Sequence, residues 1–597
     1  MLNRAASKGR MAATREILFP APTKGWVQSG NITVAGPDQA EVLENFFPTA
    51  QGARLRSGAT EYADIGTAIV RLLTYSASTD EVWASTASGI YDAERISGGG
   101  ATFADVYGLG GGDWSTTQIS TSGGYYLMAA NGVDHMHYYN GSDWNPISTV
   151  AVNNLSYDAL TAAFTVGETV TGGTSGASAA ILSIVQTSAT AGTLRLGTIT
   201  AGPFQDNEAL TSAGGAATAN GASSAGSTVT ITGIASASIE QIWLYKSRVF
   251  GVEKDSLSVW YWPVNSIGGA LTEIDLGPIF KRGGQMLFGA TWSIDSGSGI
   301  DDVCVFVTTN GEIAVYEGTD PGDANAWALA GVYEIPRPLN KHSFFKAGGD
   351  LAILTEDGII PISEALRKDK AALQAVAISY PIEDAWKSAV ANRTTEYPVT
   401  PTLWQSQAML IIGVPGATST AYVANARTGA WAKYTGWDVR CGTVANDRFY
   451  FGTNAGKVMR GQNGGNDDGV AYTGKYVPKF NTGGRSNIKV ANHAGITVKA
   501  AARPSFRMAA FSDYEIGEYP TPTSLDTIGG DVWGTGVWGT FLWGGGSTPE
   551  YAFTEWKTVR AVGYSIAPVV VVTSNQTSAP AFEILATRLR FEDAAPL

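Results

Sequence analysis

Short apolar stretches alternate with glycine-containing turns along most of the chain. Each unit has the pattern of a β-hairpin, with a short apolar strand, a Gly or Asn-Gly turn, and a second strand that ends near an aromatic residue. The clearest copy runs from Val303 to Val307, turns at Asn310-Gly311 and continues from Ile313 to Tyr316. Repeated antiparallel hairpins of this kind predict a protein built mainly from small β-sheets.

The turn glycines recur at a regular interval, at Gly89, Gly132, Gly311, Gly358 and Gly456. They lie about 40 to 50 residues apart, or twice that where another copy intervenes, which is the length of one propeller blade. The interval predicts a mainly β fold, a β-propeller of about six to seven blades.

One interval is too long, between Gly132 and the hairpin around Gly251. It contains a stretch, residues 155–235, that is poor in aromatic residues and rich in Ala, Gly, Ser and Thr. The stretch has an internal repeat, because the sequence from Phe164 to Thr171 is echoed from Phe204 to Thr211. We interpret it as a small β-domain inserted into a propeller loop, where insertions are tolerated.

Two segments have helical patterns. Glu364 to Ala377 places Leu366, Leu373 and Val376 on one face, with Ser363 as the expected N-cap. A second short helix is expected from Ile382 to Asn392.

After Gly469 the regular spacing of the glycine turns ends, and longer strand-like segments predict a C-terminal β-sandwich. The predicted domains are therefore 1–154 (an N-terminal arm and the first blades), 155–235 (the insertion), 236–469 (the remaining blades with the helical segment) and 470–597 (the C-terminal β-domain).

Within the last domain, Trp533, Trp538 and Trp543 each precede a glycine at five-residue spacing. That spacing suits neither a helix nor a strand and predicts a structured loop. The indole rings are expected either to pack in the domain's own core or to contact a partner. These three residues are the candidates for a partner interface.

The charge balance argues against binding to a phosphate backbone. The 597 residues have a formal net charge of −13 and a pI of about 4.9, whereas such binding needs clustered Lys and Arg. Two cysteines, Cys304 and Cys441, exclude a disulfide framework and are expected to be buried thiols. The basic N-terminus lacks a following apolar stretch, so no signal peptide is expected, and no window is long and apolar enough for a membrane span.

Candidates for catalysis or metal binding are few. His135 and His137 share one face of a strand, as two metal ligands would, but no third ligand is near in sequence, and satisfied or surface histidines are the alternative. Four pairs of neighbouring acidic residues have the composition of a glycosidase acid and nucleophile, but Asp is also favoured where the chain turns, and that explanation is preferred. The pairs are Asp301-Asp302, Glu356-Asp357, Glu383-Asp384 and Asp467-Asp468.

The remaining motifs are weaker still. Asn466 to Gly469 has a partial calcium-loop pattern without the distal Glu. The glycine runs Gly98 to Gly100 and Gly110 to Gly112 lack the following Lys and Ser or Thr of a phosphate-binding loop. We predict no catalytic, cofactor-binding or metal-binding residue, no cofactor, and a protein that is not an enzyme.

Several stretches together resemble the tail nozzle or tail hub proteins of short-tailed bacteriophages (podoviruses). They are Val42 to Gly58 with its Asn-Phe-Phe-Pro step and arginine-bearing strand, Asp357 to Ser363 with Ala377 to Ile382, and Asn425 to Trp431 with Phe449 to Gly469. The resemblance covers roughly residues 25–150 and 240–480 and is one of pattern and order.

The resemblance implies a structural protein of the virion tail, made in the cytoplasm of the bacterial host. It implies a homo-oligomer, a hexameric ring around the DNA-ejection channel. Its implied partners are a tail adaptor protein, a tail fibre or spike protein, and DNA that passes without sequence-specific binding.

A carbohydrate-binding or carbohydrate-active propeller is the alternative. A glycosidase needs clustered acids at the central funnel, and a lectin needs the same polar and aromatic set in each blade. The hairpin copies share turn and packing residues without a shared polar set, which favours the structural hypothesis. A fibre or spike would have a long repetitive stem, which the sequence lacks.

Overall fold

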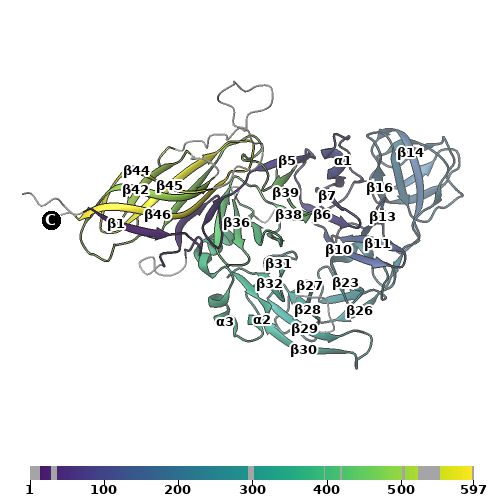
Figure 1. The fold of residues 1–597 in the computed structure, drawn as a ribbon. Helices are drawn as coiled ribbons and strands as arrows, with labels where there is room; N and C mark the ends of the chain where they lie inside the picture. Colours follow the sequence, from purple (N-terminus) through teal and green to yellow (C-terminus); the bar gives the residue numbers. More distant parts are fainter. Residues whose placement is uncertain are drawn as a thin grey trace, which may run out of the picture.

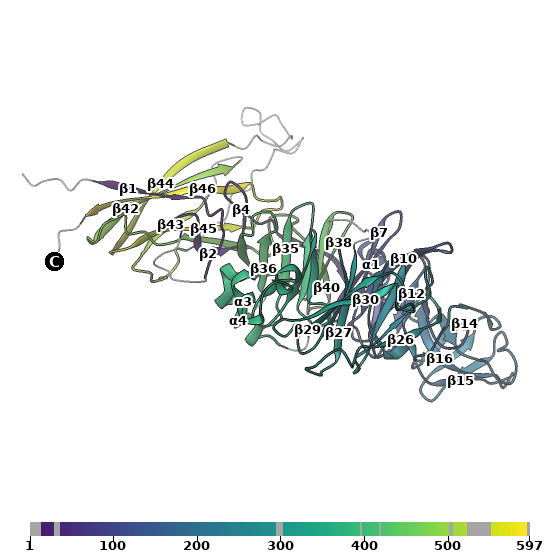
Figure 2. The same ribbon diagram turned by 90° about the horizontal axis from the view of Figure 1, so that it is seen from below.

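The computed structural model describes residues 14–28, 36–293, 302–394, 397–416, 420–500, 505–521 and 551–593. Figures 1 and 2 show three bodies in a row, with a ring of small sheets in the middle, a β-sandwich at one end and a smaller β-domain at the other. The predicted fold class, a mainly β protein with a propeller, an inserted β-domain and a C-terminal sandwich, is confirmed.

The middle body is a β-propeller, in which the described residues form seven blade sheets. The first strands of successive blades contact one another in most cases, so that these strands surround the propeller axis. In ring order the blades are β6 (Arg71–Ser76), β7 (Asp80–Ser85), β8 (Gly89–Asp92) and β9 (Val106–Tyr107); β10 (Ser115–Thr121), β11 (Gly124–Ala130), β12 (His137–Tyr139) and β13 (Trp144–Pro146); β22 (Ile239–Tyr245), β23 (Arg248–Glu253), β24 (Ser258–Tyr261) and β26 (Thr272–Asp275); β27 (Met286–Trp292), β28 (Val303–Thr308), β29 (Glu312–Gly318) and β30 (Trp327–Glu334); β31 (Phe344–Ala347), β32 (Asp350–Leu354) and β33 (Ile359–Pro361); β34 (Thr400–Trp404), β35 (Met409–Gly413), β36 (Thr420–Asn425) and β37 (Trp431–Thr435); and β38 (Cys441–Ala445), β39 (Arg448–Gly452), β40 (Lys457–Gly461) and β5 (Ala59–Asp64).

The last blade closes the ring with strands from distant parts of the chain. Strand β5 pairs antiparallel with β40, in register from Ala59 with Gly461 to Asp64 with Lys457. The first propeller strand in the sequence, β5, is therefore the outer strand of the last blade, whose other three strands follow about 400 residues later. This pairing joins the beginning and the end of the propeller.

The blade strands are apolar on both faces because each blade is packed between two neighbours. In β28, Val305 and Val307 belong to the core shared with one neighbour, whereas Cys304 and Phe306 belong to the core shared with the other. The hairpin then turns at Gly311, which has φ +81°, and a Cβ there would lie 2.3 Å from the carbonyl oxygen of Ile335. Only glycine fits that turn.

The sandwich is built from both ends of the chain. Its two sheets continue side by side from the propeller (Figure 2). One comprises β1 (Arg15–Pro20), β3 (Phe46–Pro48), β4 (Ala53–Leu55), β46 (Phe582–Asp593), β42 (Lys489–Ala500) and β44 (Tyr551–Gly563); the other comprises β2 (Ala40–Glu44), β41 (Tyr472–Pro478), β45 (Ile566–Ser574) and β43 (Arg507–Ser512) and joins the blade strand β37 through β2.

The described residues of the predicted domain 1–154 are accordingly divided mainly between the sandwich and the propeller, and the last two, Asn153 and Asn154, begin a strand of the insertion. Strands β1 to β4 lie in the sandwich, where β1 pairs with β46 from Arg15 with Phe591 to Pro20 with Ala586. The propeller begins only at β5. The described part of the expected N-terminal arm therefore belongs to the C-terminal sandwich, in which β1 and β4 pair with β46 and β2 pairs with β41.

The insertion is a compact β-domain between β13 and β22. It comprises β14 (Asn153–Ala162), β15 (Thr169–Gly172), β16 (Ser178–Gln186), β17 (Gly192–Leu196), β18 (Ala209–Thr211), β19 (Ala216–Ala219) and β20 (Ser224–Ala225). Its core includes Phe164 and Phe204, the first residues of the two repeats. A short pair of strands, β21 (Ile231–Thr232) and β25 (Gly269–Ala270), follows it.

The predicted helix from Glu364 to Ala377 is wrong as one continuous helix. The segment contains α2 (Ile362–Ala365), α3 (Lys370–Leu373) and η3 (Gln374–Val376). Asp369 interrupts it with an extended backbone, φ −65° and ψ 150°. Ser363 is not the N-cap, because it lies inside α2, whose N-cap position is Pro361. Its hydroxyl donates to Asp350 Oδ2 at 2.5 Å. The remaining helical elements are α1 (Ala93–Ser97), η2 (Ser236–Ser238), η4 (Tyr380–Ile382) and α4 (Glu383–Ala391), the last where the second helix was expected.

Candidate functional site

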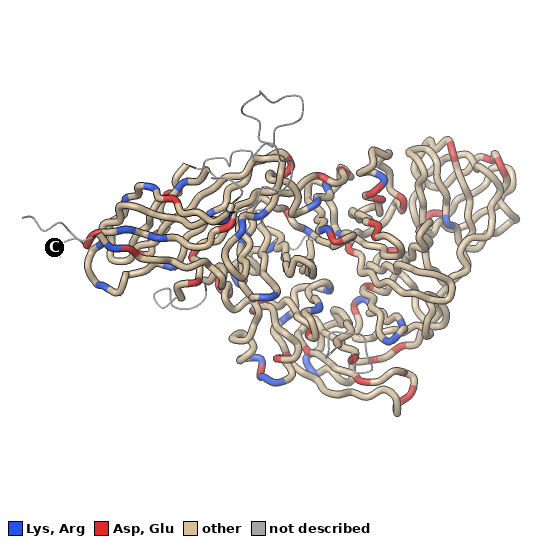
Figure 3. Tube along the Cα trace, viewed as in Figure 1, with Lys and Arg blue, Asp and Glu red and all other residues tan. Residues whose placement is uncertain are grey.

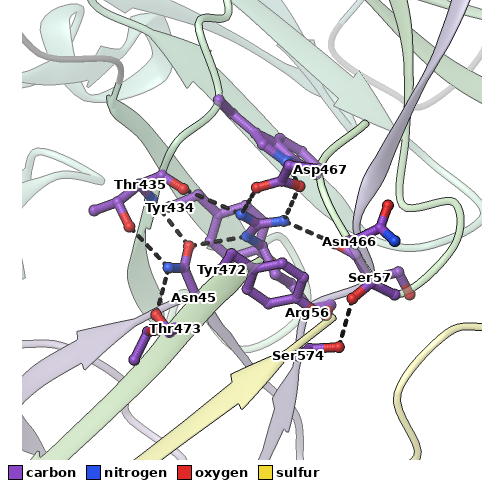
Figure 4. Close-up of polar contacts among 12 residues, drawn as sticks. Asn45, Arg56, Ser57, Tyr434, Thr435, Asn466, Asp467, Tyr472, Thr473 and Ser574 are labelled. Atoms are coloured by element: carbon purple, nitrogen blue, oxygen red, sulfur yellow. Dashed lines mark hydrogen bonds and ion pairs between the residues drawn. The ribbon is translucent and has the colours of Figure 1, made fainter. Parts of the chain in front are cut away.

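A buried arginine lies where the propeller meets the sandwich. Arg56 follows β4 and is fully buried. Its guanidinium forms a bidentate ion pair with Asp467, in which Nη1 donates to Oδ1 at 2.8 Å and Nη2 donates to Oδ2 at 2.6 Å (Figure 4). A planar guanidinium matches a carboxylate in this geometry, and the pairing is both strong and directional.

All five N–H groups of Arg56 have an acceptor. Beyond Asp467, Nε donates to Asn45 Oδ1 at 2.9 Å, Nη1 to the carbonyl oxygen of Ser57 at 3.0 Å, and Nη2 to that of Thr435 at 3.1 Å. A buried charge is tolerated only when it is paired and hydrogen-bonded, and this one is fully satisfied.

Asn45 extends the network into both bodies. Its Nδ2 donates to Thr435 Oγ1 at 2.8 Å and to the carbonyl oxygen of Thr473 at 2.7 Å, and its Oδ1 also accepts from the backbone N–H of Thr435 at 2.9 Å. The backbone of Asn45 is left-handed, φ 59°, a conformation that asparagine tolerates. One side chain thus joins the blade strand β37 to the sandwich strand β41.

Three aromatic rings surround the guanidinium. The Cζ atom of Arg56 lies 3.9 Å from the ring centroid of Tyr472, 4.9 Å from that of Trp437 and 5.5 Å from that of Tyr434. Trp437 Nε1 donates to Asp467 Oδ1 at 3.1 Å, and the Tyr472 hydroxyl donates to the carbonyl oxygen of Arg56. Burial raises the pKa of Tyr434 to about 12, so its phenol stays neutral.

We call Asn45, Arg56, Tyr434, Trp437, Asp467 and Tyr472 the junction cluster. It pairs one positive with one negative charge inside an aromatic shell, and its members come from the N-terminal strands, the last blades and the sandwich. Its polar groups bond to one another across the junction, so the arrangement holds the propeller and the sandwich together.

A second charged group lies beside the propeller axis. His342 Nε2 lies 2.8 Å from Asp113 Oδ1, and Lys341 Nζ lies 3.3 Å from Asp113 Oδ2 and 3.7 Å from Glu240 Oε1. Burial and the nearby Arg71 lower the pKa of His342 to about 4, so that its imidazole is neutral at pH 7. The contacts link residues just before β10 and β31 to β22.

The two histidines in the hairpin sequence each have a serine partner. His135 Nδ1 lies 2.9 Å from Ser236 Oγ, and His137 Nε2 lies 2.9 Å from Ser183 Oγ in the inserted domain. His137 is buried and fastens the insertion to β12. Across the described ranges, no three or more His, Cys, Asp or Glu side chains gather closely enough to hold a metal ion.

The two acids of Asp467-Asp468 have different partners. Asp467 pairs with Arg56, while Asp468 Oδ2 lies 3.0 Å from Lys457 Nζ, so both acids of the weak calcium-loop pattern face cations. Glu383 and Asp384 lie in the first turn of α4. Of Asp301-Asp302 the structure describes only Asp302.

The glycine run at Gly110 to Gly112 holds a protein carboxylate. The backbone N–H groups of Gly110 and Gly111 donate to the two oxygens of Asp134 at 2.8 and 3.1 Å. The run at Gly98 to Gly100 follows the end of α1. Cys304 and Cys441 are buried free thiols, as predicted, and burial raises the pKa of Cys441 to about 11.

Trp533, Trp538 and Trp543 lie outside the described residues. The junction cluster was not among the predicted site residues. Two of its members were noted in the sequence for other reasons. Asp467 belongs to the partial calcium-loop pattern, and Arg56 lies at the end of the arginine-bearing segment after the Asn-Phe-Phe-Pro step, where Arg54 and Arg56 alternate with Ala53 and Leu55. This alternation of charged and apolar residues predicts that both arginines lie on an exposed face of the strand. The prediction is correct for Arg54, which is exposed, and wrong for Arg56, which is buried.

No family model matches the chain, and no curated protein matches it. Among solved structures it is similar to Sqt1 of Saccharomyces cerevisiae, at 13% identity and a TM-score of 0.32, covering 68% of this chain and 98% of that one. It is also similar to YCF48 from Cyanidioschyzon merolae, at 9% identity and a TM-score of 0.26, covering 68% and 98%. A third similar structure is the beta-propeller domain of Cps50 (Swd1) of Myceliophteria thermophila, at 10% identity and a TM-score of 0.29, covering 64% and 92%.

Proposed function

We propose that the chain is a non-enzymatic structural subunit of a short bacteriophage tail, a nozzle or hub protein. In this proposal several copies, six by the resemblance, form a ring around the DNA-ejection channel in the virion. The ring docks an adaptor protein on one side and fibre or spike proteins on another.

The junction cluster is the observation that carries the proposal. A tail part must transmit force without its domains hinging, and an interface within one chain moves by default unless it is large or specifically tied. Here the first four strands lie in the sandwich and the fifth closes the propeller. Arg56, between them, donates to the carbonyl oxygen of Thr435 in the blade strand β37 and accepts from the hydroxyl of Tyr472 in the sandwich strand β41. Breaking the junction would leave a buried charge without its partner, which is strongly unfavourable.

The charge distribution supports the passage of DNA without adhesion. The net charge is −13, and Figure 3 shows acidic and basic residues interspersed along the trace of all three bodies. A surface of this kind repels a phosphate backbone and gives no continuous basic track for it to follow. Within the described residues, no helix is both long and apolar enough to cross a membrane.

The partner contacts remain proposals from the sequence. Trp533, Trp538 and Trp543 are the candidate anchors, because tryptophan is enriched at the centres of protein interfaces. The inserted domain, at the end of the molecule opposite the sandwich (Figure 2), is a second surface available to a neighbour.

The mass of the purified chain in solution tests the proposal. Light scattering over a range of concentrations should give a ring of several subunits, about six, and electron microscopy should show a central opening. A triple variant, Trp533→Ser, Trp538→Ser and Trp543→Ser, should weaken contact with partner proteins while the melting temperature of the chain stays the same. A chain that stays monomeric at every concentration, with or without the adaptor, would contradict the proposal.

A further inference from the structure

One blade of the propeller has an uncovered outer strand. Strand β30 is the outer strand of the fourth blade and lies at the margin of the ring in Figure 1. Across the described residues it pairs only with β29, so the backbone groups along its other edge face outward. An exposed strand edge is a template on which another chain can add a strand, and proteins normally protect such edges.

The outer strands of the other six blades are all protected. Strands β9 and β37 are covered by further strands, since β9 pairs with β16 of the insertion and β37 pairs with β2 of the sandwich. Strand β13 is buried and ends in Pro146, and β33 is three residues long and ends in Pro361. Strands β26 and β5 each contain two acidic residues. Covering, proline, short length and charge are common ways in which sheets avoid pairing with another chain.

Strand β30 is eight residues long, contains no proline and has no charge before its last position. Its sequence is Trp-Ala-Leu-Ala-Gly-Val-Tyr-Glu, and the final acid, Glu334, pairs with Arg282 at 2.5 Å. Leu329 is 43% exposed and Val332 is 39% exposed. The blade therefore presents an apolar, uncharged strand edge to its surroundings.

A bulge brings the two exposed apolar side chains of β30 onto one face. The register shifts at Ala330, which has no residue opposite it, and the pairing with β29 continues on both sides. Leu329 lies opposite Tyr316, and Val332 lies opposite Ala314. Tyr316 and Ala314 are two positions apart on β29 and so share a face of the sheet. The exposed leucine and valine therefore form one apolar row along the edge.

An acid lies on the other face of the same blade. Glu317, which is opposite Ala328, is exposed, and its carboxylate has no hydrogen-bond or ion-pair partner among the described residues. A strand added to β30 would lie two strand spacings from β29, about 10 Å away. Because the Ala328 side chain is small, a long basic side chain opposite it can extend across β30 to Glu317. Opposite charges on neighbouring strands stabilise their pairing.

We propose that β30 binds an extended segment of another protein, which adds to the blade as a fifth, antiparallel strand. The segment has apolar side chains opposite Leu329 and Val332 and a lysine or arginine opposite Ala328, where it meets Glu317. In strand addition of this kind, main-chain hydrogen bonds supply the affinity and the alternate side chains supply the specificity. The site adds to the proposed tail function and does not depend on it.

Binding of a fluorescent heptapeptide to the full chain, measured by fluorescence anisotropy, tests this site. The peptide Thr-Thr-Val-Thr-Val-Lys-Thr places its two valines opposite the apolar row and its lysine opposite Ala328. The comparison peptides have Glu in place of Lys, or Pro in place of the central Thr. The lysine peptide should bind at least fivefold more tightly than the glutamate peptide. The proline peptide should not bind, because proline cannot donate a main-chain hydrogen bond.

Substitutions in the chain locate the site. Glu317→Lys should reverse the preference, so that the glutamate peptide binds more tightly, whereas Glu515→Lys in the sandwich should leave the preference unchanged. Val332→Lys should weaken binding at least fivefold, whereas Val562→Lys on β44 should not. All four side chains are exposed, so the variants are expected to fold, and equal melting temperatures check this.

Three binding results would overturn the inference. They are no binding at millimolar peptide, equal binding of the lysine and proline peptides, or a preference for the lysine peptide that Glu317→Lys does not change. Light scattering supplies a fourth, because a smaller assembly of Val332→Lys than of the unmodified chain would make the edge an interface between copies.

Discussion

Arg56 and Asp467 meet through two short hydrogen bonds although 411 positions of sequence separate them. Arg56 directly follows the sandwich strand β4, and Asp467 lies in the segment that connects the last blade strand, β40, to the sandwich strand β41. Around it, Asn45 and three aromatic residues bind the same two bodies. The junction cluster makes the propeller and sandwich one mechanical unit.

Removing one partner of this ion pair should destabilise the whole molecule. Arg56→Met or Asp467→Asn should lower the free energy of unfolding by about 3–5 kcal/mol, because each leaves the other charge buried and unpaired. Chemical denaturation measures the change. The control is Lys368→Met, which breaks the exposed pair with Glu364 and should cost less than about 0.5 kcal/mol. Equal effects of the buried and exposed variants would show that the cluster is dispensable.

Gly58, two residues after Arg56, should not tolerate a side chain. A Cβ at this position would lie 1.8 Å from the carbonyl oxygen of Asn466, the neighbour of Asp467, so the backbone must move. Gly58→Ala should lower the melting temperature by at least about 2 °C, as expected for about 2 kcal/mol or more in a chain of 597 residues. Gly416→Ala is the matched control, because a Cβ there meets nothing within 4 Å. Similar melting temperatures for both variants would contradict the close packing at the junction.

The two repeats of the insertion hold each other's loops. Glu208, in the second repeat, accepts from the backbone N–H groups of Thr174 and Ser175 at 3.1 and 2.9 Å, in the loop after the first repeat. Glu168, in the first repeat, accepts from Ser212 Oγ at 2.6 Å, after the second. Burial alone would raise the pKa of Glu208, but its hydrogen bonds, above all those from Ser175 and Gln205, lower it.

Glu208→Gln should therefore open the inserted domain more than Glu168→Gln does. The neutral amide loses charge-assisted bonds at a buried site, for an expected cost of about 1–3 kcal/mol. Hydrogen exchange of residues 169–176 in the full chain measures it. Because the folded pKa of Glu208 is lowered, its stabilisation is complete at neutral pH and declines as the pH falls below about 4. Protection that is unchanged by Glu208→Gln would show that the reciprocal contacts do not hold the loops.

The contact between the insertion and the propeller should weaken in acid. Burial lowers the pKa of His137 to about 3, whereas a solvent-exposed imidazole has a pKa near ~6.5. The undocked state therefore binds the extra proton between these values, and docking loses stability as the pH falls from ~6.5 toward 3. Hydrogen exchange of residues 178–186, corrected for the intrinsic rate, should show less protection at pH 5 than at pH 7.5.

His137→Gln is the control for this titration, because glutamine can reach Ser183 without titrating in this range. Its protection should vary less between the two pH values than that of the unmodified chain. The same pH dependence in both proteins would assign the effect to another group, of which the buried His342 beside Asp113 is the first to examine.

The sequence predicted the elements whose partners are near in the chain. The turn between β28 and β29 needs a residue with positive φ, which Gly311 supplies, so Asn310-Gly311 identifies this hairpin in the sequence. The regular spacing of such turns predicts the propeller. The Phe164 and Phe204 repeats likewise revealed the insertion, since both phenylalanines enter one core.

Long-range pairing left no such local signal. Strand β1 finds its partner more than 560 residues later, where Arg15 faces Phe591, and its own sequence is compatible with an arm or with any edge strand. Arg56 has the appearance of a surface arginine because the acceptors that allow its burial, Asp467 and Thr435, come from distant turns.

The place of the protein in the particle tests the central claim most directly. Electron microscopy of phage particles labelled with an antibody to residues 153–225 gives that place, with particles lacking the gene as the control. We expect label confined to the tail, in several copies arranged around its axis. Particles without label, or a full-length tail that forms in the absence of the chain, would contradict its role as a structural tail component.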